Sequence, residues 1–325
     1  MKLLILGGTV FLGRHIAEIA LERGHDLTLF NRGRTRPELF PEAEHLTGDR
    51  DGDLGALHGR EWDAVIDTCG YFPRIVRQSV DLLRDAAGHY SFVSSLSAYQ
   101  DFTQPGITED SPVARMEKAE DQTEITGESY GPLKVLCEEA VQAGFGDRAF
   151  ISRPGLIVGP HDPSDRFTYW PVRASEDDPL LCPGDPAART QLIDVRDLAV
   201  WLLDMAQAKE GGVYNAVGPA QPLTMEAMIR GCCEGAGTNP ELRWAPDELL
   251  LECEVAPWMG LPLWIPEAEQ AVSVERAVAK GLRFRPVAET AADTLAWWRE
   301  LPDDRRQLRA GIDDTNHAEV LAKLG

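Results

Sequence analysis

Short runs of apolar residues alternate with amphipathic stretches through the first half of the chain. The apolar runs, most of them nearly continuous, predict strands at residues 2–6, 26–31, 44–47, 63–68, 90–94 and 148–153. Apolar residues at helical spacing predict helices over 11–23, 73–87 and 129–143. Strands of this kind that alternate with helices are typical of a parallel sheet covered on both faces. The pattern therefore predicts an α/β fold with a doubly wound parallel sheet.

The pattern changes after Pro154, where prolines and tryptophans become frequent. The helices predicted in this half, at residues 195–207, 224–236 and 289–301, are separated by irregular stretches. Short apolar runs at 192–193 and 213–216 are expected to rejoin the sheet. The polar end of the chain after Pro302 is expected to be poorly ordered.

These changes predict two unequal domains. The first covers residues 1–170 and is completed by sheet-rejoining segments around 191–216. The second is a smaller mixed domain over 171–325.

The chain is strongly acidic. Of its 325 residues, 53 are Asp or Glu and 32 are Lys or Arg, which gives a formal net charge of −21. Binding to nucleic acid or to an anionic membrane requires a basic surface, so we expect neither partner. No apolar stretch approaches the roughly 20 residues of a membrane helix. We expect a small-molecule substrate instead.

The cysteines indicate a reducing environment. The chain has six, at Cys69, Cys137, Cys182, Cys232, Cys233 and Cys253. They form no Cys-x-x-Cys pair and have no histidine at metal-ligand spacing. We therefore expect reduced thiols, no metal site and a cytoplasmic location.

A glycine-rich segment joins the first predicted strand to the first predicted helix. It reads Gly7-Gly8-Thr9-Val10-Phe11-Leu12-Gly13. In a doubly wound fold this position binds a dinucleotide, because Gly7 makes a tight turn and Gly13 lets the helix pack closely on the strand. The helix N-terminus then faces the pyrophosphate. The alternative is a simple strand-to-helix turn, since Val10 occupies the place of the middle glycine.

Gly7-Gly8-Thr9 followed by Phe11-Leu12-Gly13-Arg14 resembles the loop of the extended and atypical short-chain dehydrogenase/reductases, the NAD-dependent epimerase/dehydratase group. Val10 makes the resemblance closer to the atypical branch. The resemblance covers nearly the whole chain and implies a Rossmann-type NAD(P)-binding domain followed by a substrate domain. The cofactor contacts that it implies are Gly7, Thr9, Phe11, Leu12, Gly13, Asp49, Arg50, Thr68, Cys69, Gly70, Ser94, Lys134 and Pro154.

The end of the second predicted strand indicates which dinucleotide is bound. An acidic residue there would bind the ribose hydroxyls of NAD, whereas this chain has Asn31 followed by Arg32 and Arg34. Arginine suits a ribose 2′-phosphate, so NADP(H) is the preferred cofactor and NAD(H) the alternative. With Arg14 and Arg50 these arginines would form a small basic patch. Alternatively, they are solvated loop charges.

A Tyr-x-x-x-Lys pair lies on the helix predicted over 129–143. Tyr130 and Lys134 are four residues apart and therefore share one helix face. A nearby ammonium lowers the pKa of a phenol, which lets a tyrosine exchange a proton with an alcohol or carbonyl. Ser129 is expected to cap this helix, with Pro132 in its first turn.

A run of serines follows the strand predicted over 90–94. The resemblance implies that one of them hydrogen-bonds the reacting oxygen, and its match selects Ser95. Ser94 and Ser97 are the alternatives, and both also suit the capping of backbone groups at the strand end. The predicted catalytic residues are therefore Ser95, Tyr130 and Lys134.

Substrate contacts are expected on both sides of a cleft between the domains. The candidates are Tyr71, Ser97, Tyr99, Arg166, Tyr169 and Trp170. The aromatic run over 165–171 would supply a flat wall and one group for an anion or carbonyl, or would simply seat the second domain. Trp258 is expected in the core, and Asp194 is expected to cap the following helix. The acidic segment 100–128 is expected to be a solvated loop or a lid over the substrate.

These residues predict an NADP(H)-linked oxidoreductase that acts on a secondary alcohol or ketone. One alternative is a nucleotide-sugar epimerase or dehydratase that uses the same residues and retains its cofactor. Another is a dinucleotide-sensing or RNA-associated binding protein, against which the intact Ser95, Tyr130 and Lys134 set and the acidic charge argue. The resemblance allows a homodimer through the helices predicted at 73–87 and 129–143.

Overall fold

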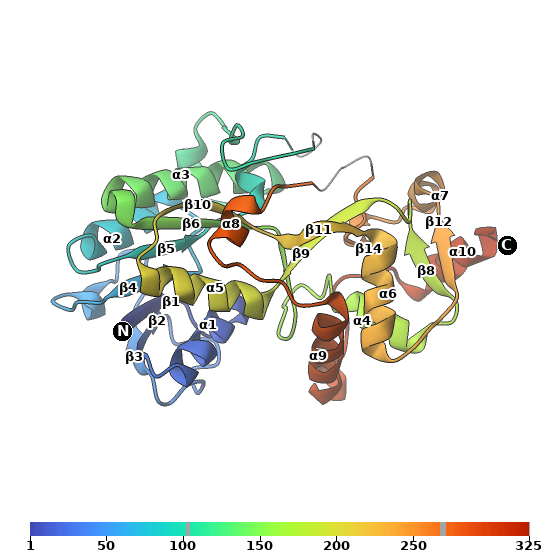
Figure 1. Ribbon diagram of the computed structural model, residues 1–325, viewed down its shortest axis with the longest axis horizontal. Helices are drawn as coiled ribbons and strands as arrows, with labels where there is room; N and C mark the ends of the chain where they lie inside the picture. The colour runs from blue at the N-terminus through green and yellow to red at the C-terminus, as the bar shows by residue number, and fades with distance from the viewer. Residues whose placement is uncertain (102–104, 267–270, 325) are drawn as a thin grey trace.

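A seven-stranded parallel sheet forms the core of the larger part of the protein (Figure 1). The structure is a computed structural model that describes residues 1–101, 105–266 and 271–324. The strand order is β10-β6-β5-β4-β1-β2-β3, and all neighbours are parallel. These strands are β1 (Lys2–Leu6), β2 (Asp26–Asn31), β3 (Glu44–Thr47), β4 (Ala64–Asp67), β5 (Tyr90–Val93), β6 (Ala149–Pro154) and β10 (Gly212–Ala216). The predicted doubly wound sheet is confirmed.

Two helix layers cover this sheet, one on each face. The covering helices are α1 (Phe11–Glu22), α2 (Pro73–Leu83), α3 (Gly127–Phe145) and α5 (Val195–Ala208). Leu3 and Ile5 of β1 belong to the core beneath α1 and α5, whereas Leu4 and Leu6 belong to the core beneath α2 and α3. Because alternate residues of a strand point to opposite faces, a strand buried on both faces must be apolar throughout.

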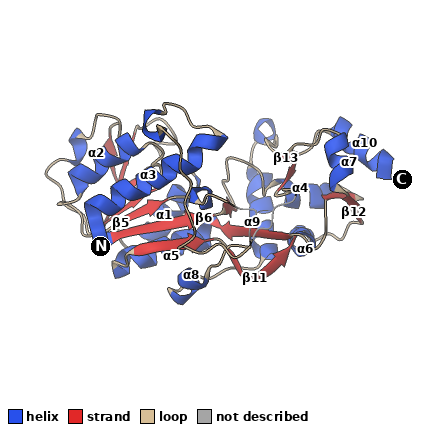
Figure 2. Ribbon diagram, turned by 90° about the horizontal axis from the view of Figure 1, so that it is seen from above, coloured by secondary structure: helices blue, strands red, loops and turns tan. Residues whose placement is uncertain are grey.

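A smaller mixed domain lies beyond the carboxyl ends of the sheet strands (Figure 2). Its helices are α4 (Tyr169–Glu176), α6 (Met225–Ala236), α7 (Asp247–Glu252), α9 (Val287–Glu300) and α10 (Asp314–Leu324), and α8 (Glu275–Ala279) lies near β10. Its strands are β7 (Leu156–Val158), β9 (Arg189–Asp194) and β11 (Gly218–Thr224) in one sheet, β8 (Leu180–Pro183) with β12 (Leu242–Ala245), and β13 (Pro257–Trp258) with β14 (Leu261–Pro262). The predicted boundary near residue 170 stays a prediction.

Two expectations about the second half are wrong. Residues 192–193 belong to β9, which pairs with β7 and β11 instead of the main sheet; only the 213–216 run joins that sheet, as β10. The end of the chain after Pro302 forms α10 rather than a poorly ordered tail. Apolar residues on that segment explain the difference, since Val320 is 0% exposed in the second-domain core.

The start of α3 also differs from its prediction. Thr126 is the N-cap, and its side chain accepts a hydrogen bond from the Ser129 N–H at 3.1 Å. In return, Ser129 Oγ accepts a hydrogen bond from the Thr126 N–H at 2.8 Å. Ser129 therefore completes a capping box and is not itself the cap. Pro132 consequently lies inside the helix, beyond its first turn. The predicted cap at Asp194 is confirmed, since its carboxylate accepts from the Arg196 N–H at 2.8 Å.

Candidate active site

The glycine loop leaves the amino end of α1 open. Gly7 has φ +113°, and a Cβ on Gly13 would lie 2.8 Å from the Gly8 nitrogen, so α1 approaches the loop as only a glycine permits. The N-cap residue is Val10, whose side chain cannot accept a hydrogen bond, and the first turn contains no acid. The free N–H groups at this helix end therefore suit the pyrophosphate of a dinucleotide.

Asn31 connects this loop to the turn after β2. Its side-chain nitrogen donates to the Gly7 carbonyl at 3.1 Å, and its oxygen accepts from the Gly33 N–H at 2.8 Å. Asn31 therefore positions the two turns. Arg32 and Arg34 are exposed beside it, and neither has an ion pair within the described parts of the chain. Their exposure fits a 2′-phosphate group.

Arg50 does not belong to the predicted basic patch, because its side chain is buried. Its assignment as a cofactor contact stays a prediction. Its guanidinium forms two hydrogen bonds of 2.7 Å to Asp67 and a third of 3.1 Å to Ser79. Both Arg50 and Asp67 are buried, and the Tyr90 hydroxyl also donates to Asp67 at 2.8 Å. Burial opposes the charge on Arg50, but the Asp67 carboxylate outweighs it and raises the Arg50 pKa. Arg50 is thus a structural residue.

The backbone after β4 passes directly beside the glycine loop. Both Thr68 Oγ1 and Cys69 Sγ donate to the Leu6 carbonyl, at 3.0 and 3.3 Å. These bonds hold residues 68–70 at the carboxyl end of the sheet, where the resemblance places the cofactor ribose. The predicted contacts of Thr68, Cys69 and Gly70 are compatible with this position.

Lys134 ties the ends of two strands together. Its Nζ donates to the Gly70 carbonyl at 2.8 Å and to the Val93 carbonyl at 2.7 Å. The ammonium also lies 4.5 Å from the centre of the Phe92 ring and 5.2 Å from that of Tyr71. Burial lowers the Lys134 pKa, which nearby acidic groups partly offset. One ammonium proton is left for a further partner, which agrees with the predicted ribose contact.

Tyr130 and Ser95 are brought together as predicted. Burial raises the pKa of Tyr130, while its hydrogen bond to Ser95 and the positive charge of Arg166 oppose that rise. Ser95 Oγ also accepts from the Ser97 N–H at 3.1 Å, which fixes the serine at the end of β5. Arg166, rather than Lys134, is the cation that acts on Tyr130. The assignment of Lys134 to lowering the Tyr130 pKa stays a prediction.

Gly131 is a site residue that the sequence analysis missed. A Cβ on Gly131 would lie 2.1 Å from the Ser97 carbonyl oxygen. Helix α3 therefore touches the turn that carries Ser95, and any side chain at this position would force the two apart. The sequence signal was the glycine directly after Tyr130, inside a predicted helix where glycine is otherwise unfavourable.

Four of the predicted contact residues are buried. Tyr99, Tyr169 and Trp170 are at most 2% exposed, so their side chains belong to the protein interior, and their assignment as substrate contacts stays a prediction. Tyr99 donates to Asn215 at 2.6 Å, and Trp170 donates to the Pro262 carbonyl at 3.0 Å, so both serve packing. Ser94 is also buried, and its hydroxyl donates to Glu138, so its side chain is already bonded within the protein. The predicted cofactor contact of Ser94 stays a prediction.

Three further predicted residues are exposed or partly exposed. Tyr71 is 43% exposed, and Ser97 and Arg166 are partly exposed. Trp258 packs only in part against the second-domain core, contrary to expectation, and its ring lies beneath the Arg166 guanidinium at 5.1 Å. Arg166 is thus partly exposed above Trp258 and stays a predicted substrate contact, whereas its neighbours Tyr169 and Trp170 pack in the core of the second domain.

The segment 100–128 includes residues 102–104, which lie outside the described residues. Its described part is anchored rather than freely solvated. Ile107 is 6% exposed and forms a bridge with Val272, and Glu109 accepts from the Asn215 N–H at 3.0 Å. Whether the segment acts as a lid stays a prediction.

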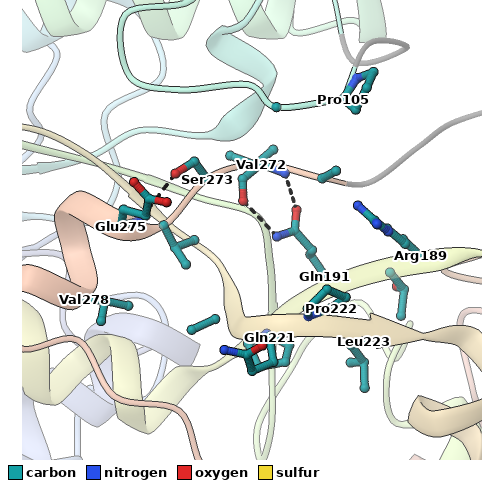
Figure 3. A pocket seen from close by; sticks show the side chains of 16 residues that line it. Pro105, Arg189, Gln191, Gln221, Pro222, Leu223, Val272, Ser273, Glu275 and Val278 are labelled. Carbon is teal, nitrogen blue, oxygen red and sulfur yellow. Dashed lines mark hydrogen bonds between the residues drawn. The ribbon is translucent and has the colours of Figure 1, made fainter.

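A separate hollow of about 500 Å³ lies between β9, β11 and the segment before α8 (Figure 3). The Gln191 amide crosses it, accepting from the Val272 N–H at 2.8 Å and donating to the Val272 carbonyl at 3.0 Å. None of the predicted catalytic, cofactor or substrate residues lines this hollow. We therefore place the candidate active site at the carboxyl ends of β1, β4 and β5.

The sheet order, the open glycine loop and the Ser95, Tyr130 and Lys134 cluster define a dinucleotide-binding protein of the Rossmann type. Residues 3–217 match the NAD dependent epimerase/dehydratase family. Because this match covers more than half of the chain, the chain belongs to that family. Its members are enzymes, which confirms at this level the expectation of an enzyme. Within the described residues, no helix could cross a membrane and no acidic, His or Cys cluster could hold a metal ion.

Individual relatives agree with this assignment. Chloroplast stem-loop binding protein of 41 kDa b from Arabidopsis thaliana is 26% identical over 263 residues, which are 74% of this chain but only 65% of that protein. The Bordetella bronchiseptica enzyme WbmH, solved with NAD+, is 19% identical with a TM-score of 0.68 over 92% of this chain and 98% of its own. UDP-glucuronic acid 4-epimerase from Bacillus cereus, solved with NAD, is 15% identical with a TM-score of 0.66 over 91% and 96%. The two structures establish the shared fold.

Proposed function

We propose that the chain is an NADP(H)-linked oxidoreductase of the atypical branch of its family and interconverts a secondary alcohol and a ketone. The observation that carries the proposal is that Tyr130 interacts with Ser95, which the Ser97 N–H fixes at the end of β5, and lies one helical turn from the buried Lys134. This pair lies at the same edge of the sheet as the glycine loop. A proton-transfer group therefore lies beside a dinucleotide site.

Each residue has a distinct task. In reduction, Tyr130 donates its hydroxyl proton to the carbonyl oxygen, and in oxidation it accepts the proton of the alcohol. Ser95 donates a hydrogen bond to that same oxygen, and Lys134 holds a ribose hydroxyl. The bound nicotinamide would supply or accept the hydride. Because burial keeps the Tyr130 pKa above its ordinary value, its hydroxyl is protonated at neutral pH and suits reduction.

A second candidate, an epimerase or dehydratase with retained cofactor, is favoured by the structural relatives. One of them is named a UDP-glucuronic acid 4-epimerase. The same three residues would serve that reaction without net oxidation. The test is to denature the purified protein, identify any released nucleotide, and incubate fresh protein with NADP+ and a panel of secondary alcohols. Stoichiometric NADPH formation is the expected result, whereas a tightly held nucleotide without net NADPH formation would establish the second candidate.

Replacing Arg32 with alanine is expected to weaken NADPH binding by about tenfold or more, because charge-assisted bonds to the 2′-phosphate are lost. Binding of NADH, which has no 2′-phosphate, should change little. Isothermal titration with both nucleotides measures the difference. Arg60→Ala is the matched control, since Arg60 is exposed and pairs with Glu44 at 2.8 Å. Equal weakening of both nucleotides would contradict a 2′-phosphate site.

We do not extend stem-loop binding from the Arabidopsis protein to this chain. A net charge of −21 opposes binding to a polyanion, and Arg50 lies in a buried ion pair instead of on the surface. A small-molecule substrate, a cytoplasmic location and a homodimer through α2 and α3 complete the proposal.

A further inference from the structure

Arg166 is a half-buried cation whose charge has no direct partner. Its Nε donates to Ser164 Oγ at 3.1 Å, and its Cζ lies 5.1 Å from the centre of the Trp258 ring. Among the described residues, no carboxylate lies within ion-pair distance of Arg166, whereas the buried arginines Arg50 and Arg153 each bind a carboxylate at 2.7 or 2.6 Å. Withdrawing a guanidinium from water is unfavourable without a partner, and Asp162 acts on Arg166 only through Ser164. Within the described part of the chain, no group is bonded to the two terminal nitrogens of Arg166, which are therefore available to a further anion.

The surrounding loop keeps the nearest acid away from this guanidinium. Ser164 donates its hydroxyl proton toward the two oxygens of Asp162, at 2.8 and 2.9 Å, and thereby stands between Asp162 and Arg166. The carboxylate of Asp165 is bonded to a different residue, since it accepts a hydrogen bond from the Arg309 N–H at 3.2 Å. Neither Asp162 nor Asp165 therefore forms a direct ion pair with the Arg166 guanidinium.

Arg166 is also electrostatically coupled to Tyr130. It is the cation that interacts electrostatically with Tyr130, whose hydroxyl is bound by Ser95. Lys134 is already committed to two carbonyl groups. A negative group bound by Arg166 would therefore share the electrostatic environment of the Tyr130 hydroxyl.

We propose that Arg166 and Trp258 bind the carboxylate of the substrate, and that this substrate is a hydroxy acid or the corresponding keto acid. The planar guanidinium matches a carboxylate with two parallel hydrogen bonds, and the indole covers one face of that pair. A single arginine in a protein of net charge −21 balances one negative charge, which disfavours a diphosphate beside it. This inference rests on the proposed function, because it takes Tyr130 as the proton-transfer residue.

The test measures binding instead of turnover, so it is separable from the test of the proposed function. Tyr130→Phe protein loaded with NADP+ is titrated with 3-hydroxybutyrate and mandelate, with the amide of each, and with glycerol 3-phosphate and UDP-glucose. The acids are expected to bind at least about tenfold more tightly than their amides. Adding Arg166→Met should weaken the acids by roughly 10- to 100-fold and leave the amides unchanged.

Two further variants complete the design. Arg166→Lys keeps the charge without the planar fork and should restore part of the affinity. Arg230→Met removes an equal charge from the exposed side of α6, where Arg230 pairs with Glu226 at 2.8 Å, and should have no effect. The proposal is overturned if the acids bind no better than their amides, if Arg166→Met leaves their affinity intact, or if the phosphate ester or UDP-glucose is preferred. Retained turnover in Tyr130→Phe alone would count against the proposed function and not against the carboxylate site.

Discussion

Replacing Tyr130 with phenylalanine is expected to reduce turnover by about 10²- to 10⁴-fold, the usual contribution of a positioned general acid or base. The phenyl ring occupies the same space, so the packing of α3 should be preserved. Only the hydroxyl that bonds Ser95 is lost. Steady-state kinetics with the alcohol or ketone found for the wild-type protein measures the loss, and NADPH titration should give an unchanged affinity.

A matched control is Tyr214→Phe. Tyr214 is 7% exposed in β10, and its hydroxyl donates to the Gly211 carbonyl at 3.0 Å, away from the candidate active site. This variant also loses one tyrosine hydroxyl but should keep its turnover. If Tyr130→Phe kept wild-type turnover as well, the assignment of Tyr130 as the proton-transfer residue would be wrong.

Replacing Arg50 with methionine is expected to lower the free energy of unfolding by about 3–5 kcal/mol, as is typical when one partner of a buried ion pair is removed. Asp67 is 0% exposed, so its carboxylate would be left without its cation in a site that water does not reach. The Tyr90 hydroxyl would be its remaining side-chain donor. Urea unfolding of the two proteins measures the difference.

Two comparisons test the cause of that loss. Arg60→Met breaks an exposed pair with Glu44 and should cost less than about 1 kcal/mol. The double variant Arg50→Met with Asp67→Leu removes both charges and should recover much of the lost stability, because no buried charge is then left unpaired. A cost for Arg50→Met as small as that for Arg60→Met would show that the pair contributes little.

The sheet could be predicted from the sequence because its physical cause is local. A strand buried on both faces must be apolar throughout, and β1 shows this directly. All six strands predicted in the first half of the chain lie at or within one residue of their observed limits, including Lys2–Leu6 and Asp26–Asn31. The glycine loop could also be predicted from the sequence, because position 13 must be glycine to avoid Gly8, which is only five residues away in the chain.

Burial of polar and aromatic residues could not be predicted in the same way. Arg50 and Asp67 are 17 residues apart, and their pairing depends on how the turn after β3 packs against β4. Tyr99 and Trp170 have the chemistry of substrate contacts, but their exposure is set by distant partners, Asn215 and Pro262. Residue type indicates what a side chain can do, whereas the fold decides whether it meets a ligand.

Trp258 was predicted to be buried in the core but is only partly buried. Its apolar character suggested the core, yet the loop that contains it places the ring under Arg166. The backbone at Trp258 has φ +66°, a conformation that a bulky residue rarely adopts and that no local sequence preference indicates. Tertiary contacts of this loop, including the hydrogen bond from the Gly311 N–H to the Met259 carbonyl at 2.7 Å, hold it in place.

The contact between Gly131 and Ser97 has a consequence for redesign of this protein. The backbone of α3 at Gly131 lies so close to the Ser97 carbonyl oxygen that a single added carbon would not fit. Position 131 is therefore expected to accept only glycine. Met259, by contrast, is 43% exposed on the loop that also carries Trp258. With the proposed roles of Tyr130 and Trp258, new substrate preferences are best sought by varying this loop, because the proposed proton-transfer residue and the proposed carboxylate site lie on elements that can be altered separately.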